Sequence, residues 1–597
     1  MDQGENKVIN ERINKLREIM AKEGLDAYII GGSDPHQSEY TAERWATRKW
    51  ISSFTGSAGL VVVTADKAGL WTDSRYHLQG ASELNDTEIE LFKVGLPDVP
   101  SYLEWLISEL PTGSIIGSNE WTTSIENRKN IEMELAGTGL SFTGTRDFLD
   151  DVWIDRPDFP GKPVFQLDFK YTGKTREDKI SDIRKWMKNK KLDWSFISSL
   201  SDIAWILNLR GSDISFNPLF LSYLLIGKGS LYLYINEGQI SLDLMKQLEA
   251  ESITIKSYKE LKKHVLSLPF GRINLDPESS SIGINDLFTN TWEKIYEKDI
   301  SIGMRAVKNE VEISSVKNAM KKDGAALVKF MIWLEENWSS GNYNEVDIAD
   351  KLAVFRGSQD GFMGLSFATI AGFNDHGAII HYSAKKESAH TLSSPGVLLL
   401  DSGGQYLDGT TDITRILVSG DIDSEVIHDY TLVLKGHIDL ALIKFPEGTK
   451  GVQLDMLARK ALWDEGRNYG HGTGHGVGFF LNVHEGPQTI SQKAVDIAIR
   501  EGMITSNEPG IYLENKYGIR IENLIIAVKS DIGKTEDFLE FETLSLCPLE
   551  LDLIDFSMMT EFQKEWVNNY HNKVYSTLAP LLDESERVWL KGKTRRI

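Results

Sequence analysis

The chain has 597 residues, of which 41% are hydrophobic and 25% charged, and its formal net charge is −22. These values fit a globular protein of about two to four domains, because a single hydrophobic core rarely serves a chain of this length. They argue against nucleic-acid binding, which needs Lys and Arg clustered on one face. The single cysteine, Cys547, excludes an intrachain disulfide and a thiolate metal site.

The N-terminal segment 1–20 is charged and lacks the continuous apolar core of a signal peptide. No stretch of the sequence approaches the roughly 18 uninterrupted apolar residues of a membrane helix. We therefore expect a cytoplasmic protein that does not bind membranes.

The first part of the chain, up to about residue 310, predicts one α/β plan used twice. In each copy a helix is followed by a buried strand, a Gly-containing turn and two further strands. Two unrelated α/β domains would also give this loose order. The first copy comprises a helix with Ile9, Ile13, Leu16, Ile19 and Met20 at helical spacing, then segments 25–32, 50–59, 60–64 and 68–76. The second comprises a helix with Ile180, Ile183, Trp186 and Met187 on one face, then segments 192–199, 205–214, 221–229 and 230–235.

Two boundaries follow from composition. Segment 155–163, with three prolines in nine residues, predicts a linker between the copies. A long helix begins within 304–337, and strands and helices alternate beyond it to about residue 530. We expect three domains, at 1–154, 155–306 and 307–597. The last ends in a helical tail, 540–597, which we expect to pack on the part of the chain directly before it.

Asp401 and Asp412 lie eleven residues apart in the segment 395–420. The sequence predicts an apolar strand that ends at Asp401, a Gly-rich turn, and a second strand that begins near Asp412. Two aspartates on facing parts of a hairpin can converge on one point, and such oxygen ligands suit Mn²⁺, Mg²⁺ or Co²⁺. The alternative is that both are turn residues, because Asp is common beside Gly.

The Gly-rich segment 470–487 contains His471, His475 and His484. Its glycines disfavour regular structure and allow the backbone to approach a ligand closely. Only 12 histidines occur in the chain, so three within fourteen positions is a concentration that composition does not predict. Three histidines in such a loop indicate binding more than a structural role.

Glu508 precedes a Pro-Gly break, and Glu522 is expected within one apolar strand that spans 517–528. A buried carboxylate needs a cation or an arginine partner. Arg520 shares a face of the expected strand with Glu522, so an internal Arg520–Glu522 pair is the alternative to a metal. Two Asp, one His and two Glu in one domain together predict a metal site.

The motifs DGTTDITR, GHGTGHGVG, NVHEGP and EPGIY resemble those of the pita-bread metallopeptidases, and within them the large three-domain aminopeptidase P group. The resemblance extends over most of the chain, including RAVKNEVEI and LWTDSRYHLQ. It implies an α/β (α+β) fold, with two creatinase-like N-terminal domains followed by a pita-bread catalytic domain. One departure is visible: Asp375 and His376 stand where a Pro-Asn-like pair is expected, so His376 inherits no role.

The resemblance implies an Xaa-Pro aminopeptidase that releases the first residue of peptides with proline second, by means of a hydroxide that bridges two metal ions. It assigns Asp401 and Asp412 to one metal and His475 to the other, with Glu508 and Glu522 shared. Mn²⁺ is the expected metal, with Co²⁺ or Zn²⁺ as alternatives. Glu508 is the candidate that takes the proton of the water.

The resemblance also implies substrate-side residues. His484 is the candidate donor to the scissile carbonyl, His381 orients the substrate, and His471 resembles a third histidine of this kind. Arg75 resembles an arginine that reaches a substrate site from the first domain of a partner subunit in a homodimer. The structural alternatives are a core position for His381, which follows the apolar run GAII, and an ordinary surface position for Arg75.

Three rival functions remain open from the sequence. Prolidase cleaves Xaa-Pro dipeptides with the same ligands, although the two preceding domains and the tail favour aminopeptidase P. A binding protein that has lost catalysis would show broken ligands, and all five are present. Methionine aminopeptidase is disfavoured because about 300 residues precede the catalytic domain.

Overall fold

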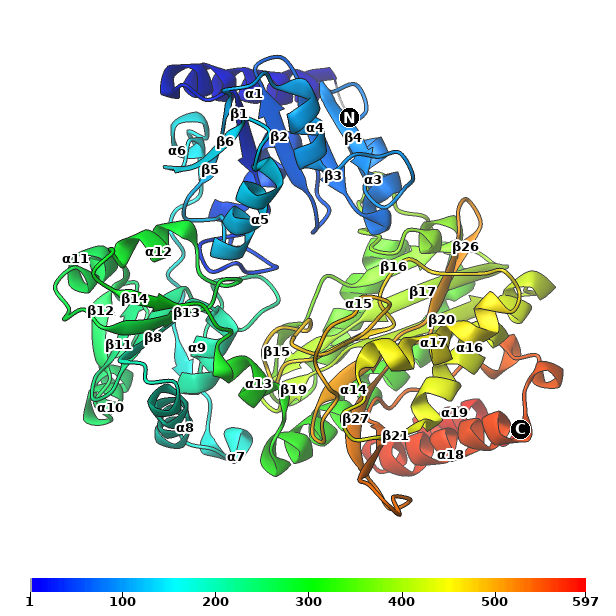
Figure 1. Cartoon of the computed structure of the whole chain (residues 1–597). Helices are drawn as coiled ribbons and strands as arrows, with labels where there is room; N and C mark the ends of the chain where they lie inside the picture. The colour runs from blue at the N-terminus through cyan, green and yellow to red at the C-terminus, as the bar shows by residue number, and fades with distance from the viewer. Residues whose placement is uncertain (1–2) are drawn as a thin grey trace. The chain divides into compact units, whose positions relative to one another are not determined.

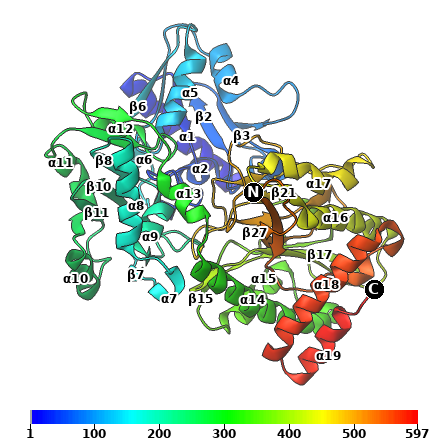
Figure 2. The ribbon, with the colours of Figure 1, turned by 60° about the horizontal axis from the view of Figure 1, so that its bottom comes forward.

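The computed structural model describes residues 3–597, so the first two residues of the charged N-terminal segment lie outside the described part. Contacts divide the chain into two compact units (Figures 1 and 2). The first unit extends to Leu167 and continues from Lys174 to Ile302. The second consists of Asp168–Gly173 and Gly303–Ile597.

The first sheet of unit 1 has six strands. The amphipathic helix α1 (Gln3–Glu23) packs on it with Ile9, Ile13, Leu16 and Met20, which are 0–2% exposed, as their spacing predicts. In spatial order the strands are β4 (Ile89–Lys93), β3 (Ala68–Thr72), β2 (Leu60–Thr64), β1 (Ala27–Ile30), β5 (Ile115–Asn119) and β6 (Ser141–Thr145).

The second sheet of unit 1 has the same strand order and the same strand directions. In both sheets the central strand pairs antiparallel on one side and parallel on the other. The plan predicted twice is thus observed twice. The second sheet consists of β12 (Thr254–Ser257), β11 (Leu231–Ile235), β10 (Ser222–Gly227), β8 (Trp194–Ile197), β13 (Arg272–Leu275) and β14 (Glu293–Ile295).

One expectation for both copies was wrong in detail. A short helix, and not only a Gly-containing turn, follows the first strand: α2 (Thr47–Ser52) in one copy and α9 (Leu200–Leu207) in the other. The eight residues of α9 are all buried, so their apolar run alone did not distinguish a buried helix from a strand. The other elements of unit 1 are α3 (His77–Glu83), α4 (Tyr102–Glu109), α5 (Ile125–Leu135), α6 (Leu149–Val152), β7 (Phe165–Gln166), α8 (Arg176–Asn189), β9 (Leu209–Arg210), α10 (Leu242–Ala250), α11 (Leu261–Val265) and α12 (Ile282–Leu287).

The long helix of unit 2, α14 (Glu310–Asn337), begins where its sequence predicts. The side chain of Asn309 accepts from the backbone N–H groups of Val311 and Glu312, and Glu312 returns a bond to the Asn309 N–H. This reciprocal cap fixes the first turn. Preceding it is α13 (Ile300–Ala306), and the short α7 (Phe169–Thr172) packs against α14.

Five further helices complete unit 2. The C-terminal pair contacts α14, which confirms the predicted helical tail (Figure 2). Cys547 is buried in the core beneath α14. The helices are α15 (Glu345–Gly357), α16 (Ser424–Leu442), α17 (Gly451–Trp463), α18 (Glu561–Leu578) and α19 (Glu584–Lys593).

The strands of unit 2 form two principal sheets and three small ones, most of them antiparallel hairpins. The principal sheets are β16 (Ile370–Phe373), β17 (Gly396–Ser402) and β20 (Ile413–Ser419), and β21 (Lys444–Pro446), β28 (Phe538–Thr543), β27 (Asn523–Ser530) and β24 (Ile504–Asn507). The small ones are β15 (Phe362–Leu365) with β18 (Gly404–Tyr406) and β19 (Gly409–Thr410), β22 (Gly474–His475) with β23 (Thr489–Ile490), and β25 (Gly510–Leu513) with β26 (Tyr517–Arg520).

The single strand expected over 517–528 is two strands. β26 ends at Arg520 and β27 starts at Asn523, so Glu522 lies in the break between two sheets. Apolar residues continue through the break, which is why the sequence pattern did not reveal it. No helix in the described part of the chain has the length and apolar character needed to cross a membrane.

Candidate metal centre

The two aspartates meet at one end of a hairpin. β17 and β20 pair antiparallel, with Asp401 opposite Thr414 and Ser402 opposite Ile413. Asp412 directly precedes β20, so this register places it beside the end of β17 that carries Asp401. Both side chains are buried.

The two glutamates flank a break in a second hairpin. β24 and β27 end with Asn507 paired to Asn523, and Glu508 and Glu522 are their immediate neighbours. The hairpin resumes beyond them as β25 and β26. In a continuous strand, successive side chains would point to opposite faces of the sheet. The break frees both carboxylates from this alternation.

His475 connects the two pairs of carboxylates. Its Nδ1 lies 2.9 Å from the carbonyl oxygen of Gly476, and donation there leaves Nε2 as an acceptor or metal ligand. Nε2 lies 3.4 Å from Asp412 Oδ2 and 3.4 Å from Glu508 Oε1. One ligand atom each of Asp412, His475 and Glu522 lies within 4.8 Å of the other two.

Negative charge is crowded in this cluster. Burial, together with the neighbouring carboxylates, raises the pKa of Asp401 and raises that of Glu522 well above its ordinary value, although Arg520 lowers both. The same causes, opposed by His475 and Arg520, raise the pKa of Glu508 to about 6. Burial lowers the pKa of His475, but Asp412 and Glu508 more than offset this and raise it to about 9.

Divalent cations fit this set of donors. Within the described residues, the buried Oδ1 of Asp401 has no hydrogen-bond partner. Three buried carboxylates and the partly buried Glu508 face one arginine and one histidine, so they need further cations, and their oxygens suit hard divalent metals.

Arg520 supports the centre from the end of β26. Its guanidinium donates to Asp401 Oδ2 at 2.6 Å, to the Tyr512 hydroxyl at 2.7 Å and to Thr414 Oγ1 at 3.2 Å. The internal Arg520–Glu522 pair that the sequence left open is therefore wrong, because the break in the strand directs Arg520 to Asp401. The Glu522 carboxylate instead accepts from Thr414 Oγ1 at 2.8 Å.

Tyr512 was missed by the sequence analysis, although it lies within the EPGIY motif. Its hydroxyl accepts from Arg520 and lies 2.8 Å from His471 Nε2. This links His471 to the centre through two side chains. Neighbouring the same centre, the ring of His484 packs edge-on against that of His475, with centroids 4.4 Å apart.

Glu485, the residue after His484, was also missed. Its buried carboxylate binds Arg305 Nη1 at 2.5 Å and Lys308 Nζ at 2.8 Å. These two cations lower its pKa, since they outweigh the effect of burial. The triad ties the histidine-bearing loop to the segment before α14. A charged residue inside a Gly-rich motif was the only signal in the sequence.

His381 and Arg75 are the two remaining residues that the sequence assigns to the substrate. His381 is partly buried, next to Tyr382, in the segment that follows the 3-10 helix η5 (Asn374–Ala378). Arg75 belongs to unit 1 and pairs with Asp73 through Nε at 2.8 Å and Nη2 at 2.7 Å. Their roles toward a substrate remain predictions.

Family models match nearly the whole chain. Residues 314–529 match metallopeptidase family M24, and 537–597 match the C-terminal region of that peptidase family. Residues 12–151 and 155–312 each match the creatinase/prolidase N-terminal domain. The expected fold class, two creatinase-like domains before a pita-bread domain, is confirmed.

Full-length relatives are similar to this chain. A probable Xaa-Pro aminopeptidase P of Coprinopsis cinerea is 38% identical over 98% of this chain and 98% of its own length. Aminopeptidase P2 of Arabidopsis thaliana is 36% identical over 98% of this chain and 88% of its own.

Among solved structures, the X-prolyl aminopeptidase of Caenorhabditis elegans, described as a cytosolic enzyme with a di-nuclear active site, is 35% identical. It superposes with a TM-score of 0.95 over 99% of this chain and 100% of its own. The prolidase of Pyrococcus horikoshii covers only 62% of this chain, at 24% identity and a TM-score of 0.50, so its likeness is one of fold.

Proposed function

The chain belongs to the Xaa-Pro aminopeptidases of metallopeptidase family M24, and from this premise we propose how its residues release the first residue of peptides with proline second. The observation that carries the proposal is the convergence of Asp412, His475 and Glu522 within 4.8 Å, beside Asp401 and Glu508. The similarity over 98% of the chain supports the same activity.

We assign Asp401 and Asp412 to one metal ion, His475 to the other, and Glu508 and Glu522 to both. Two divalent cations held there would supply a water molecule of lowered pKa and a counter-charge to the negative charge that develops during hydrolysis. The carboxylate-rich donor set favours a hard cation, so Mn²⁺ is our proposed metal.

Glu508 is our candidate general base. Its pKa of about 6 supports proton transfer near neutral pH, because a base works best when its pKa lies near the working pH. Ser506 Oγ donates to its Oε1 at 3.0 Å, which fixes the carboxylate.

The histidines act on the substrate in this proposal. His484 donates a hydrogen bond to the scissile carbonyl, where negative charge develops, and His381 orients the peptide. His471 is held by Tyr512 at 2.8 Å and completes the substrate side. A proline nitrogen offers no N–H, so these contacts must act without a donor at the second residue.

Two further assignments concern the compartment and the assembly of the protein. We propose a cytoplasmic enzyme, as the nematode relative is described as cytosolic. We also propose a homodimer in which Arg75 reaches the substrate site of the partner, a role that suits its rigid donor fork.

Hydrolysis of Xaa-Pro-Xaa tripeptides, compared with Xaa-Pro dipeptides, tests the function. With Mn²⁺ we expect cleavage of the tripeptides at the Xaa–Pro bond and little cleavage of dipeptides, and a chelator should abolish the rate. A preference for dipeptides would make the protein a prolidase. Absence of hydrolysis of both, with metals bound, would contradict an enzymatic function.

A further inference from the structure

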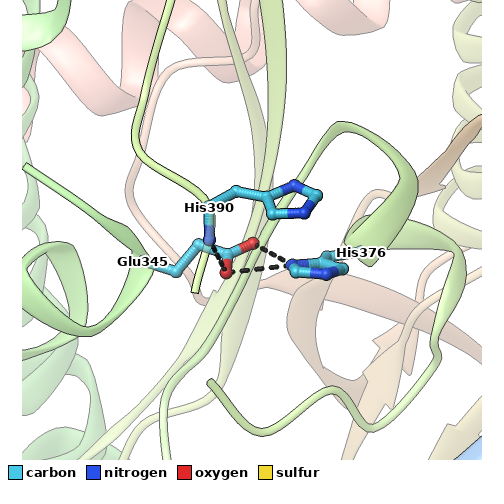
Figure 3. Close-up of side chains that lie close together, drawn as sticks. All are labelled: Glu345, His376 and His390. Atoms are coloured by element: carbon cyan, nitrogen blue, oxygen red, sulfur yellow. Dashed lines mark hydrogen bonds and ion pairs between the residues drawn. The ribbon is translucent and has the colours of Figure 1, made fainter. Parts of the chain in front are cut away.

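A second group of metal-ligating side chains lies in unit 2, formed by residues that the metal centre does not use. Glu345, His376 and His390 bring one ligand atom each to within 4.8 Å of the other two (Figure 3). Glu345 begins α15, His376 lies in η5, and His390 lies in the segment before β17. Sequence analysis gave none of the three a role.

The Glu345 carboxylate is the buried centre of this group. Its side chain is fully buried, and three fixed donors bind it: the Phe373 N–H at 2.8 Å, the Tyr382 hydroxyl at 2.8 Å and the His390 N–H at 2.9 Å. A carboxylate has about four lone-pair positions. Nδ1 of His376 faces both oxygens of this carboxylate, at 2.9 Å from Oε1 and 3.0 Å from Oε2.

This distance is that of a hydrogen bond and is shorter, by about 0.5 Å, than the span of two zinc–ligand bonds. Zinc binds imidazole nitrogen at about 2.0–2.1 Å and carboxylate oxygen at about 2.0–2.2 Å, and two such bonds at the tetrahedral angle join atoms about 3.4 Å apart. A cation can take the place of the proton between Oε1 and Nδ1 once the His376 ring moves back by about 0.5 Å, and the neutral ring then carries its proton on Nε2.

His390 supplies a third donor. Its ring stacks on that of His376, with centroids 3.6 Å apart and 24° between the planes (Figure 3). The side chain is 40% exposed, and one of its ring nitrogens lies within 4.8 Å of the ligand atoms of Glu345 and His376. On the solvent side Asp375 Oδ1 lies 3.5 Å from His390 Nδ1 and adds negative charge.

We propose that Glu345, His376 and His390 form a third metal site, which takes a borderline divalent cation such as Zn²⁺. Two imidazoles and one carboxylate with open positions for water are a zinc-type donor set, in contrast to the carboxylate-rich centre. The bound cation joins the start of α15, η5 and the segment before β17. It thereby anchors the stretch 373–382, which contains His381.

The rival explanation is that a protonated His376 simply neutralises Glu345 and that no metal binds. The Mn²⁺-loaded enzyme, equilibrated with Zn²⁺ and freed of excess ion by gel filtration, separates the two by total metal per chain. We expect wild type to retain one more metal ion than His376→Gln and His390→Ala. Equal metal content in wild type and both variants would overturn the proposal.

The matched control is His428→Ala. His428 is 40% exposed, as His390 is, and its Nε2 lies 2.7 Å from Glu465 Oε2, but it belongs to no such group of three among the described residues. This variant should keep the wild-type metal content. Loss of the same ion in His428→Ala would show non-specific surface binding and contradict the site.

Two further measurements address two other cases: a variant that folds poorly, and an extra ion that binds at the main centre. Co²⁺ added to the Mn²⁺-loaded wild type should give visible bands of a nitrogen-ligated ion, and their absence would refute the site without any variant. In Glu522→Gln, which disables the main centre, the difference in Zn²⁺ content caused by adding His390→Ala should persist. Its disappearance would assign the extra ion to the main centre.

Discussion

Arg520 donates a 2.6 Å hydrogen bond from Nη2 to Oδ2 of Asp401, the buried carboxylate at the end of β17. The same guanidinium binds the Tyr512 hydroxyl and Thr414. A proposed metal ligand therefore has one oxygen fixed by an arginine, while its Oδ1 lacks a hydrogen-bond partner in the described structure. Arg520 thus orients that free oxygen.

Arg520→Lys tests this orientation. Lysine keeps the charge but cannot reach Asp401, Tyr512 and Thr414 in one fork. We expect a loss of about 10- to 100-fold in metal affinity or in kcat/KM, the usual effect of removing a partner that orients a metal ligand. Metal titration and steady-state kinetics measure it. Wild-type values in this variant would mean that Asp401 needs no such support.

Glu522→Gln tests the shared ligand. The variant removes one of four carboxylate charges between two cations, so their mutual repulsion is less well compensated. We expect fewer than two metals per chain and no measurable turnover, with the fold retained because Thr414 can still donate to the amide oxygen. Elemental analysis and circular dichroism check both. Two bound metals with a normal rate would refute the shared position.

His484→Ala and His381→Ala separate the substrate-side roles. A donor to developing charge lowers kcat, whereas a positioning residue also raises KM. We expect His484→Ala to lower kcat by about 10²-fold or more, and His381→Ala to raise KM as well. Both should keep two metals. Kinetics close to wild type in the two variants would assign these histidines a structural role.

His437 makes stability depend on pH. Burial, and next the charge of Arg415, lower its pKa to about 3; its Nδ1 lies 3.1 Å from the Asn507 carbonyl and its Nε2 3.0 Å from the Asn523 amide. The unfolded chain takes up the proton near pH 6.5, before the folded chain does. The free energy of unfolding should therefore fall as the pH is lowered from 6.5 toward 3, by up to about 1.4 kcal/mol per pH unit. Above pH 6.5 the His437 contribution should not change with pH.

Urea unfolding of wild type and His437→Gln between pH 4 and 8 isolates this contribution. The difference in unfolding free energy between the two proteins should change with pH only below about 6.5. His428→Gln, an exposed histidine, serves as the control. Parallel curves for wild type and His437→Gln would show that His437 does not carry the effect.

Arg75→Ala tests the homodimer proposal. If Arg75 holds the peptide bound to a partner subunit, its loss should raise KM for longer peptides more than for tripeptides. Both metals should stay bound. Light scattering gives the oligomeric state, and KM against peptide length gives the profile. A fully active monomer would contradict the dimer, and an unchanged length profile would contradict the role across subunits.

The sequence alone predicted the repeated α/β plan and the chemistry of the metal ligands. Local patterns carry this information: the helical spacing of Ile9, Ile13 and Leu16 specifies a buried face, and Asp401 and Asp412 belong to strand–turn–strand segments that the chain forms locally. Only one predicted strand, 517–528, concealed a break, because apolar residues run through it.

Tertiary structure alone decided which groups pair. Arg520 and Glu522 would share a face of a continuous strand, but the break sends Arg520 to Asp401, 119 residues away. Glu345 meets His376 and His390 only because α15, η5 and the segment before β17 converge, across 31 and 45 residues. Such contacts depend on packing between distant segments, and local periodicity in the sequence does not predict that packing.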